Sequence, residues 1–374
     1  MTPGSVIALD ARLVGYAAGI ARYAELLSRA LAELPDGDEQ YVILRGRKTR
    51  GRSLAGSATR TRTRLCLTPP HHRLERWTLP VEVLPTHASL LHSLDHVTPR
   101  WGSWRRVVTL HDLAFLLYPN THTQASRAYY AAAGESARRA ERVIAVSQRT
   151  ASDAIRLLGV DPVRVRVVHE AAAAAFNARP RSELDAVAAR YGLDTDRPYI
   201  LFVGTLEPRK NVGMLFEVLK QVRRDVDVQL LLAGARGWLD EPIFAAHAAS
   251  GVGQAAQFLG PVGEADLAVL YSHAAVFVLP SLYEGFGLPV LEAMACGAPV
   301  VCSGAGPLPE VADDAATLLK AEDVAAWTQA VLRVLMDRAQ ADRMRAAGFR
   351  RAAQFSWAAT ARATREVYRE ALLA

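Results

Sequence analysis

Two glutamates separated by seven residues dominate the stretch 281–297, which follows an apolar segment typical of a buried strand. Glu284 lies in the connecting loop. Glu292 lies about one turn into a helix that Pro289 and Gly297 bracket. A single glutamate on such a helix is ordinarily a solvated or capping residue. Two carboxylates around one loop can accept hydrogen bonds from several hydroxyl groups of one ligand, such as a sugar and a ribose.

The loop between these glutamates contains Gly285 and Gly287, followed by Leu288 at the start of the helix. Glycine lets the backbone approach a ligand closely, and the free amide groups of a helix N-terminus favour an anion. The loop therefore predicts a phosphate-bearing ligand.

A second candidate is the basic pair Arg209 and Lys210, which follows a predicted strand that ends at Gly204. Two fixed cations can stabilise the negative charge of a departing diphosphate without a metal ion. An isolated Arg-Lys turn is usually only solvated, but the glutamate pair in the same chain favours the ligand-binding interpretation.

Two features of the first half are less specific. His111 ends the predicted strand 107–110, where a histidine can equally be a hydrogen-bonded structural residue. The stretch 15–23, which includes Gly19, follows the first predicted strand and opens a helix. A simple strand-to-helix turn would explain it.

These residues are distributed over short apolar runs that alternate with amphipathic segments, which indicates parallel βα units. In the first half the expected strands are 6–9, 41–44, a run near Cys66, 107–110, 143–147 and 165–168, with helices over 20–34, 123–140 and 148–158. In the second half the expected strands are 199–204, 228–234, 256–260, 275–281 and 299–303, with helices that begin near residues 211, 242, 264 and 289. Both halves are predicted to be doubly wound α/β domains, in which ligands bind beyond the carboxyl ends of the strands.

A chain of 374 residues is too long for one hydrophobic core. We place the domain boundary after Phe176, because residues 177–198 carry proline and charge without a strand pattern. This gives a first domain over 1–176 and a second over 177–356.

The motifs together resemble glycosyltransferase family 4, whose signature is two glutamates separated by seven residues in an EGFGLP context. The resemblance extends over nearly the whole chain. It implies the GT-B architecture, in which two Rossmann-like domains face each other across a cleft. The first domain would bind the acceptor and the second the nucleotide-sugar donor, with the last helix, 357–374, packing back on the first.

The resemblance also implies roles for individual residues. Glu284 would contact the hydroxyl groups of the donor sugar, and Glu292 those of the ribose. Arg209 and Lys210 would hold the diphosphate, and His111 would lie near the donor sugar. The remaining donor contacts would come from backbone groups at Gly19, Gly204, Val262, Gly285, Phe286, Gly287 and Leu288.

The implied reaction is transfer of a hexose with retention of configuration, with no cofactor and no metal ion. Similarity to bacterial mannosyltransferases of polysaccharide assembly suggests mannose from GDP-mannose, passed to a glycan or a lipid-linked saccharide. A UDP-sugar donor stays open, as does a noncatalytic nucleotide-sugar binder or an epimerase of the same fold.

Charge is distributed unevenly along the chain. Residues 1–180 contain 25 Lys and Arg against 15 Asp and Glu, and residues 45–64 carry eight basic residues and no acid, so we expect a basic loop there. A basic first domain favours an anionic partner such as a membrane surface, whereas no nucleic-acid-binding module is recognisable. The apolar runs are too short to span a bilayer, and a cytoplasmic location is expected. Peripheral contact at the inner membrane face and an ordinary solvated basic surface both stay open.

Overall fold

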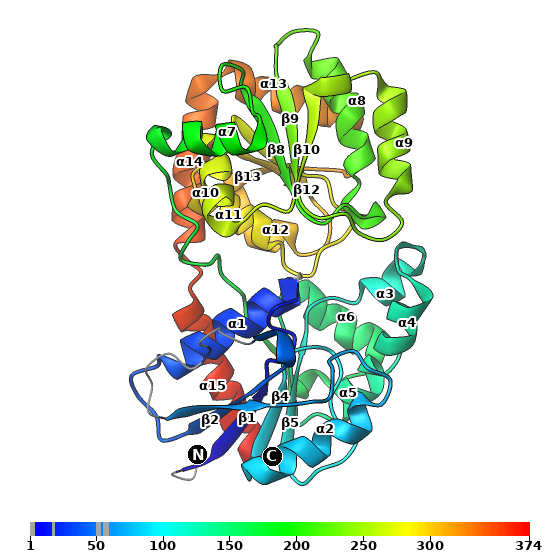
Figure 1. The fold of residues 1–374 in the computed structure, drawn as a ribbon, viewed down its shortest axis with the longest axis vertical. Coiled ribbons are helices and arrows are strands. Elements are labelled where there is room, and N and C mark those ends of the chain that lie inside the picture. The colour runs from blue at the N-terminus through cyan, green and yellow to red at the C-terminus, as the bar shows by residue number, and fades with distance from the viewer. Residues whose placement is uncertain (1–3, 17–18, 50–53, 55–59) are drawn as a thin grey trace. The chain divides into compact units, whose positions relative to one another are not determined.

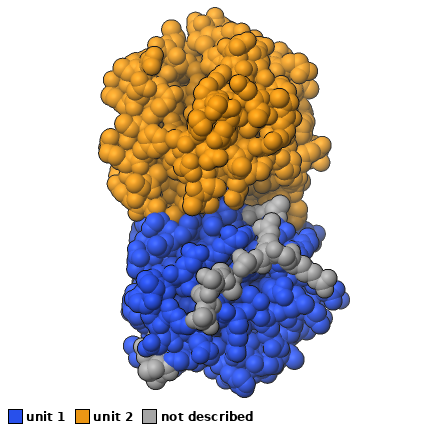
Figure 2. Space-filling view, turned by 60° about the vertical axis from the view of Figure 1, so that its left-hand side comes forward, with its two compact units in different colours: residues 1–117, 124–170, 356–374 blue, residues 118–123, 171–355 orange. Residues whose placement is uncertain are grey.

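The structure is a computed structural model that describes residues 4–16, 19–49, 54 and 60–374. It divides into two compact units, shown in Figure 2. Unit 1 comprises residues 1–117, 124–170 and 356–374, and unit 2 comprises 118–123 and 171–355. Relative to the expected boundary after Phe176, the structure places both 118–123 and 171–176 in unit 2.

The described part of unit 1 forms a seven-stranded parallel sheet with the order β3-β2-β1-β4-β5-β6-β7 (Figure 1). Its strands are β1 Val6–Asp10, β2 Gln40–Arg45, β3 Thr61–Leu65, β4 Leu90–Ser93, β5 Arg105–Leu110, β6 Arg142–Ala145 and β7 Val165–Val167. Its α-helices are α1 Gly19–Ala32, α2 Glu75–Val83, α3 Ala114–Leu117, α4 Gln124–Tyr130, α5 Ala133–Arg139, α6 Gln148–Leu158 and α15 Trp357–Leu373.

Unit 2 has a six-stranded parallel sheet with the order β10-β9-β8-β11-β12-β13 in the part of the chain that is described. Its strands are β8 Tyr199–Val203, β9 Gln229–Ala233, β10 Ala256–Gly260, β11 Val276–Leu279, β12 Val300–Ser303 and β13 Ala316–Leu319. Its α-helices are α7 Leu184–Tyr191, α8 Val212–Val222, α9 Glu241–Ser250, α10 Glu264–His273, α11 Leu288–Ala295, α12 Leu308–Ala312, α13 Val324–Met336 and α14 Arg338–Ala352. This is the strand order of the Rossmann fold. From β8 the chain adds β9 and β10 on one side of the sheet, and it then crosses over to add β11, β12 and β13 on the other side.

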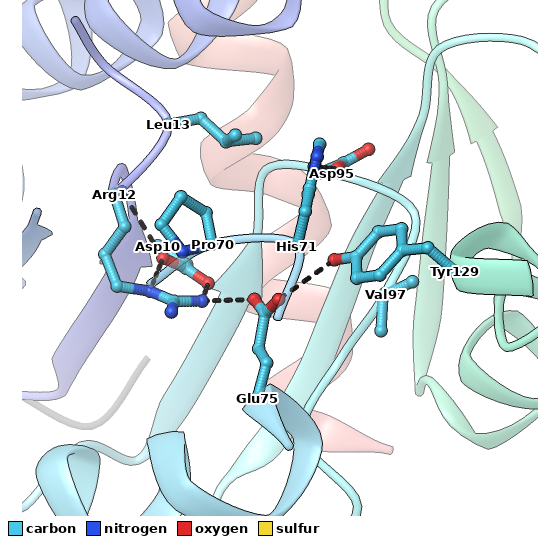
Figure 3. Close-up of a pocket in the computed structure, with 9 residues that line it drawn as sticks. All are labelled: Asp10, Arg12, Leu13, Pro70, His71, Glu75, Asp95, Val97 and Tyr129. Atoms are coloured by element: carbon cyan, nitrogen blue, oxygen red, sulfur yellow. Dashed lines mark hydrogen bonds and ion pairs between the residues drawn. The ribbon is translucent and has the colours of Figure 1, made fainter. Parts of the chain in front are cut away.

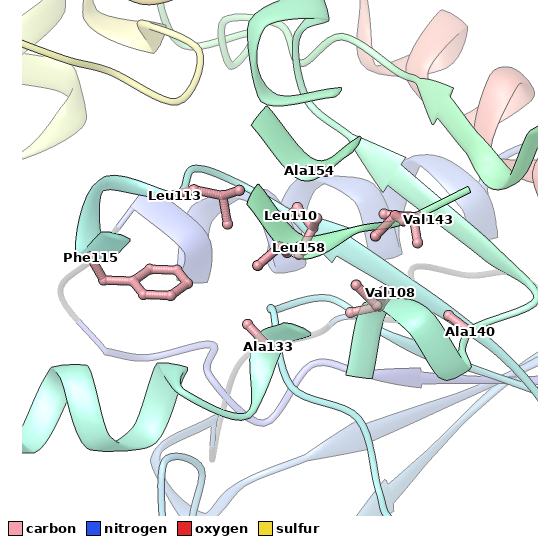
Figure 4. Packing of buried hydrophobic residues seen from close by; sticks show 11 residues of the cluster. Val108, Leu110, Leu113, Phe115, Ala133, Ala140, Val143, Ala154 and Leu158 are labelled. Carbon is pink, nitrogen blue, oxygen red and sulfur yellow. The ribbon is translucent and has the colours of Figure 1, made fainter. Parts of the chain in front are cut away.

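The core of unit 1 forms where helices cover the central strands. One buried cluster joins β5 and β6 to α5 and α6 (Figure 4). Small alanines on the helices, among them Ala133, Ala137 and Ala154, let the helices approach Val108, Leu110 and Val143 on the strands. Each fully buried valine or leucine side chain contributes about 1.5–3 kcal/mol to folding, so such clusters fix the positions of the loops above them.

The last helix, α15, packs against α1 and against β4, β5 and β6 of unit 1. A buried polar chain fixes it there, since His92 Nδ1 lies 2.7 Å from the Tyr368 hydroxyl and His92 Nε2 lies 2.8 Å from Thr109 Oγ1. Burial lowers the pKa of His92 to about 3, so the ring is neutral and can bond to both hydroxyls.

Some elements differ from the sequence-based expectation. The strands β4 and β13 and the helix α2 were not expected, and the helix expected over 123–140 is two helices, α4 and α5. The strand expected near Cys66 is β3, which ends at Leu65. In the expected basic loop 45–64, residues 47–49 form a 3-10 turn and β3 begins at Thr61, whereas 50–53 and 55–59 lie outside the described residues.

Hydropathy along the helices is moderate. None of the helices within the described residues is both long enough and apolar enough to cross a membrane.

Candidate active site

The candidate site of unit 2 lies at the point where its strand order reverses. Because β8 and β11 are neighbours and parallel, the loops that follow them leave the same edge of the sheet side by side. The loop after β8 carries Arg209 and Lys210, in a 3-10 turn over Pro208–Lys210, and the loop after β11 carries Glu284.

The structure brings these three predicted residues into direct contact. Lys210 Nζ lies 2.6 Å from Glu284 Oε1, and Arg209 Nη1 lies 3.3 Å from Glu284 Oε2. Arg209 Nη2 also lies 2.6 Å from Oε1 of Glu207, and the Ser281 hydroxyl donates to Glu284 Oε1 at 2.6 Å. Both oxygens of Glu284 are therefore engaged by groups of the protein.

The charges of this cluster balance, because two cations face the carboxylates of Glu284 and Glu207. Burial of Glu284 opposes its ionisation, but the positive charges of Lys210 and Arg209 outweigh burial and lower its pKa to about 2. Glu284 is thus ionised at every pH at which an enzyme is normally assayed.

Backbone contacts hold the two loops together. The amide of Leu282 donates to the carbonyl oxygen of Arg209 at 2.9 Å, and Arg209 Nη1 donates to the carbonyl oxygen of Tyr283 at 2.6 Å. Ser303, at the end of β12, donates its hydroxyl to the carbonyl oxygen of Ser281 at 2.6 Å. The charged side chains are consequently positioned on two rigid loops, which is the arrangement that preorganised electrostatic stabilisation requires.

The glycine-rich loop leads from β11 into α11. Gly287, the N-cap of α11, has a φ of +104°, and a Cβ there would lie 2.5 Å from a methyl group of Leu308, so only glycine fits. Phe286 is buried and its ring packs against Phe355. The side chain of Phe286 is therefore taken up by packing, and the predicted donor contact at this position is one of its backbone.

Gly204 and Val262 lie at the ends of other strands of the same sheet. Gly204 follows β8, and its carbonyl oxygen approaches Gly234 so closely that a Cβ on Gly234 would lie 1.9 Å away. The amide of Gly234 donates to the carbonyl oxygen of Gly260 at 2.8 Å, next to the turn with half-buried Val262. The predicted backbone contacts of the second domain thus lie along one edge of the sheet.

Glu292 lies on α11 and is buried, with an exposed fraction of 1%. The Tyr271 hydroxyl donates to Glu292 Oε2 at 3.2 Å. Glu292 therefore has a partner of its own on α10, separate from the contacts of Glu284.

An open hollow of about 470 Å³ adjoins the loop that carries Glu284. Its lining includes Leu282 of that loop, Gly304 after β12 and Lys320 after β13. The hollow therefore lies next to this loop, and its lining includes none of Lys210, Arg209 and Glu284.

His111 of unit 1 is held by two acceptors. Its Nε2 lies 2.9 Å from the carbonyl oxygen of Leu94, and its Nδ1 lies 3.3 Å from Oε1 of Glu170. Burial disfavours the charged ring, but the hydrogen bond and negative charge of Glu170 outweigh burial and raise the pKa of His111. In this structure a sugar hydroxyl would have to replace one of these partners to contact a ring nitrogen.

Gly19, the remaining predicted residue of unit 1, begins α1. A Cβ on Gly19 would meet open space, so its backbone is accessible but does not require glycine. Gly15 does require glycine, because its φ is +94° and a Cβ would lie 2.8 Å from the carbonyl oxygen of Lys48. Ala17 and Ala18 of the same stretch lie outside the described residues.

A second charged cluster surrounds a cavity of about 10 Å³ in unit 1, which is large enough for about one water molecule (Figure 3). Buried Arg12 bridges Asp10 and Glu75 at 2.7 Å and 2.5 Å, and the hydroxyl of Tyr129 donates to Glu75. These contacts satisfy the buried charges within the cluster, so we assign it a structural role.

Three partners in these sites were missed from the sequence: Glu207, Ser281 and Glu170. Glu207 stands two residues before Arg209, and Ser281 three residues before Glu284. Both are polar residues inside the predicted motifs, so the sequence could have indicated them as partners. Glu170 is 59 residues from His111, and strand order alone does not indicate the contact, because β6 lies between β5 and β7.

Comparison with protein families accounts for both units. Residues 185–351 match the family model described as "Glycosyl transferases group 1", and residues 17–172 match "Glycosyltransferase Family 4". The chain is also 35% identical over 256 residues to O-antigen chain mannosyltransferase B of Escherichia coli, covering 68% of this chain and 67% of that protein.

The chain belongs to glycosyltransferase family 4. It is 32% identical over 250 residues to a D-inositol 3-phosphate glycosyltransferase from a Nocardioides species, covering 62% of this chain and only 54% of that protein. Among solved structures it is similar to the sucrose-phosphate synthase of Thermosynechococcus elongatus, with a TM-score of 0.78, 24% identity and 98% of both chains covered. The predicted GT-B fold, built from two Rossmann-like domains, is confirmed, and the family 4 chain is a glycosyltransferase.

Proposed function

We propose that the protein transfers mannose from GDP-mannose, with retention of configuration, to a hydroxyl group of a glycan or lipid-linked saccharide. The observation that carries the proposal is the contact of Lys210, Arg209 and Glu284 at the carboxyl edge of the unit 2 sheet. The choice of mannose rests on the similarity to the O-antigen chain mannosyltransferase of Escherichia coli.

In the proposed mechanism the diphosphate of the bound donor forms ion pairs with Lys210 and Arg209. The bond between the anomeric carbon and the diphosphate oxygen breaks, and the acceptor oxygen forms its bond to that carbon on the same face. The departing diphosphate takes the proton of the acceptor hydroxyl, so atoms and charges balance. Lys210 and Arg209 would stabilise the charge that develops on the diphosphate.

Glu284 has two tasks in this scheme. It holds both cations in place before the donor arrives, which avoids reorganisation during the reaction. Its remaining acceptor capacity would bind hydroxyl groups of the donor sugar, while Glu292 would bind the ribose.

The reaction is proposed to need neither a cofactor nor a metal ion, because Lys210 and Arg209 would offset part of the negative charge of the leaving group. Treatment of the purified protein with EDTA is therefore expected to leave the rate of donor consumption nearly unchanged. The measurement is release of nucleoside diphosphate before and after chelation. Loss of activity that Mg²⁺ or Mn²⁺ restores would contradict the metal-free mechanism.

The donor assignment predicts that GDP and GDP-mannose raise the melting temperature more than UDP, ADP and their sugar conjugates. A ligand that binds only the folded protein adds about 2.7 kcal/mol of stability at a concentration one hundred times its Kd. The measurement is a thermal-shift series with a Lys210→Ala variant as control, in which the shift should be much smaller. Selective stabilisation by UDP would replace the GDP-mannose proposal with a UDP-sugar donor.

Binding without turnover of any donor would instead favour a noncatalytic nucleotide-sugar binder. Release of nucleoside diphosphate from the stabilising donor, with and without candidate saccharide acceptors, distinguishes these outcomes.

A further inference from the structure

Helix α2 of unit 1 exposes an apolar stripe to solvent. Leu74, Trp77, Val81 and Leu84 follow one another at helical spacings of three and four residues, so they lie on one face. Their exposed fractions are 48%, 51%, 60% and 45%. Large exposed apolar side chains gathered in this way mark an interaction surface rather than the ordinary scatter of a protein surface.

The opposite face of α2 shows why the stripe faces outward. Leu79 and Val83 belong to a buried cluster with Ala8, Val42 and Leu91 of the sheet. The helix is therefore fixed by one face to the core of unit 1, and α2 lies at the surface of that unit (Figure 1). Rotation of the helix to bury the stripe would expose Leu79 and Val83.

Two neighbouring segments extend the stripe. Trp101 is 38% exposed, and its indole N–H donates to the carbonyl oxygen of Trp77 at 3.2 Å. Leu67 is 62% exposed, and its amide donates to the carboxylate of Glu82 on α2. We call these six residues the α2 patch: Leu67, Leu74, Trp77, Val81, Leu84 and Trp101.

The stretch of sequence that contains the α2 patch is rich in positive charge. Residues 45–105, which contain the whole patch, hold twelve Lys and Arg against three Asp and Glu, a net charge of +9. The rest of the chain holds 32 against 35, a net charge of −3. Arg73 adjoins Leu74 and is exposed, and the Arg100 guanidinium lies 4.9 Å from the centre of the Trp77 ring.

We propose that the α2 patch docks unit 1 onto the surface of an anionic lipid bilayer. Tryptophan and leucine can enter the interfacial region while the surrounding arginines contact lipid phosphates, and both contributions are needed for stable peripheral binding. The combination of exposed aromatic and aliphatic side chains, the adjoining Arg73 and Arg100, and a positively charged stretch of sequence fits this partner better than a protein surface of ordinary charge. Such docking would bring the enzyme to the lipid-linked acceptor of the proposed function.

The test is cosedimentation of the full-length protein with vesicles, without donor or acceptor. We expect binding to vesicles of phosphatidylcholine mixed with phosphatidylglycerol, weak binding to phosphatidylcholine alone, and a decrease with added salt. Because no transfer reaction is involved, failure of this experiment would leave the proposed function intact, and failure of the transferase assays would leave docking intact.

A matched pair of variants distinguishes the contribution of the α2 patch to vesicle binding from the effect of net charge. Val81→Glu lies in the α2 patch, whereas Val163→Glu makes the same change at a valine of unit 1 that is 65% exposed and outside the patch. Val81→Glu should weaken vesicle binding by about tenfold or more, and Val163→Glu by much less. A double variant, Trp77→Ser with Val81→Ser, should weaken binding without a change of charge.

Three outcomes would overturn the proposal: absence of binding to anionic vesicles, equal effects of the two glutamate variants, or unaltered binding of the serine variant. A fourth would replace it. If light scattering shows a dimer that Val81→Glu converts to a monomer, the α2 patch is an interface between two copies of this chain.

Discussion

Replacement of Glu284 by glutamine is expected to lower kcat by about a hundredfold or more and, in the same protein, to tighten the binding of a free nucleoside diphosphate. The two effects have opposite signs. Glu284 is proposed to bind the donor sugar, but it also competes with the diphosphate for the positive charges of Lys210 and Arg209. Lys210 Nζ lies 2.6 Å from Glu284 Oε1, so part of the positive charge that a diphosphate needs is already neutralised. Glutamine keeps the shape of the side chain and removes that competition.

The measurements are calorimetric titration with the nucleoside diphosphate that the thermal-shift series selects and release of that product from its sugar conjugate. Glu207→Gln is the matched control. Glu207 is as buried as Glu284 and contacts Arg209 at 2.6 Å, but it is not predicted to contact the donor sugar. It should therefore tighten diphosphate binding with a much smaller loss of kcat. Weaker diphosphate binding by Glu284→Gln would contradict the proposed competition.

The same carboxylate contributes to stability in a pH-dependent way. The pKa of Glu284 falls from an ordinary value of 4.5 to about 2 on folding, so its contribution is complete above 4.5 and is lost as the pH falls toward 2. Loss of one partner of a buried ion pair costs about 3 kcal/mol, so Glu284→Gln should also melt at a lower temperature at neutral pH. Circular dichroism of the variant separates this loss of stability from the loss of turnover.

The sequence motifs were sufficient to predict that Arg209, Lys210 and Glu284 lie at one edge of the unit 2 sheet, because their positions follow from sheet topology. Arg209 and Lys210 end one βα unit and Glu284 ends another, and a strand order that reverses between those units makes the two loops neighbours. The strand pattern places these side chains at one edge of the sheet, whereas the prediction that they serve one ligand came from the glutamate motif and the resemblance to glycosyltransferase family 4. Their mutual ion pairs were not predictable, since periodicity does not determine side-chain rotamers.

Two of the missed elements, β4 and α2, have sequences that disagree with their local structure. The buried strand β4 reads Leu-Leu-His-Ser and includes polar His92, which the core accepts only because Thr109 and Tyr368 satisfy both of its ring nitrogens. Helix α2 contains Pro80, which ordinarily breaks a helix. In both elements tertiary packing overrides local propensity, and the contacts responsible come from distant parts of the chain.

His111→Ala is expected to lower kcat by about ten- to a hundredfold, and Glu170→Gln is expected to change the pH dependence of turnover as well as its size. Leu94 accepts a hydrogen bond from Nε2 of His111, and the carboxylate of Glu170 faces Nδ1. A ring that faces two acceptors is best satisfied when both nitrogens carry protons, which agrees with the raised pKa of His111. Glutamine at 170 removes the negative charge but keeps the side-chain volume.

Without that charge, only the hydrogen bond to the Leu94 carbonyl and the charge of Asp95 oppose burial, so the pKa of His111 should fall in Glu170→Gln. In the wild type, the stability gained from the charged pair is complete below the ordinary histidine pKa of 6.5 and is lost as the pH rises through the raised value. If turnover requires the charged ring, the alkaline limb of the kcat profile should move to lower pH in Glu170→Gln. Glu366→Gln, an exposed position on α15, is the control and should leave the profile unchanged.

A purely structural His111 would give a different pattern. Both His111→Ala and Glu170→Gln would then lower the melting temperature, while the folded fraction would keep the wild-type kcat and pH profile. Measurement of kcat and KM separately adds a further distinction, because a residue that acts only on the transition state lowers kcat without raising KM. If His111→Ala instead lowers kcat of the folded protein without raising KM, the charged His111–Glu170 pair of unit 1 is an electrostatic element of the reaction in addition to the cation–carboxylate cluster of unit 2.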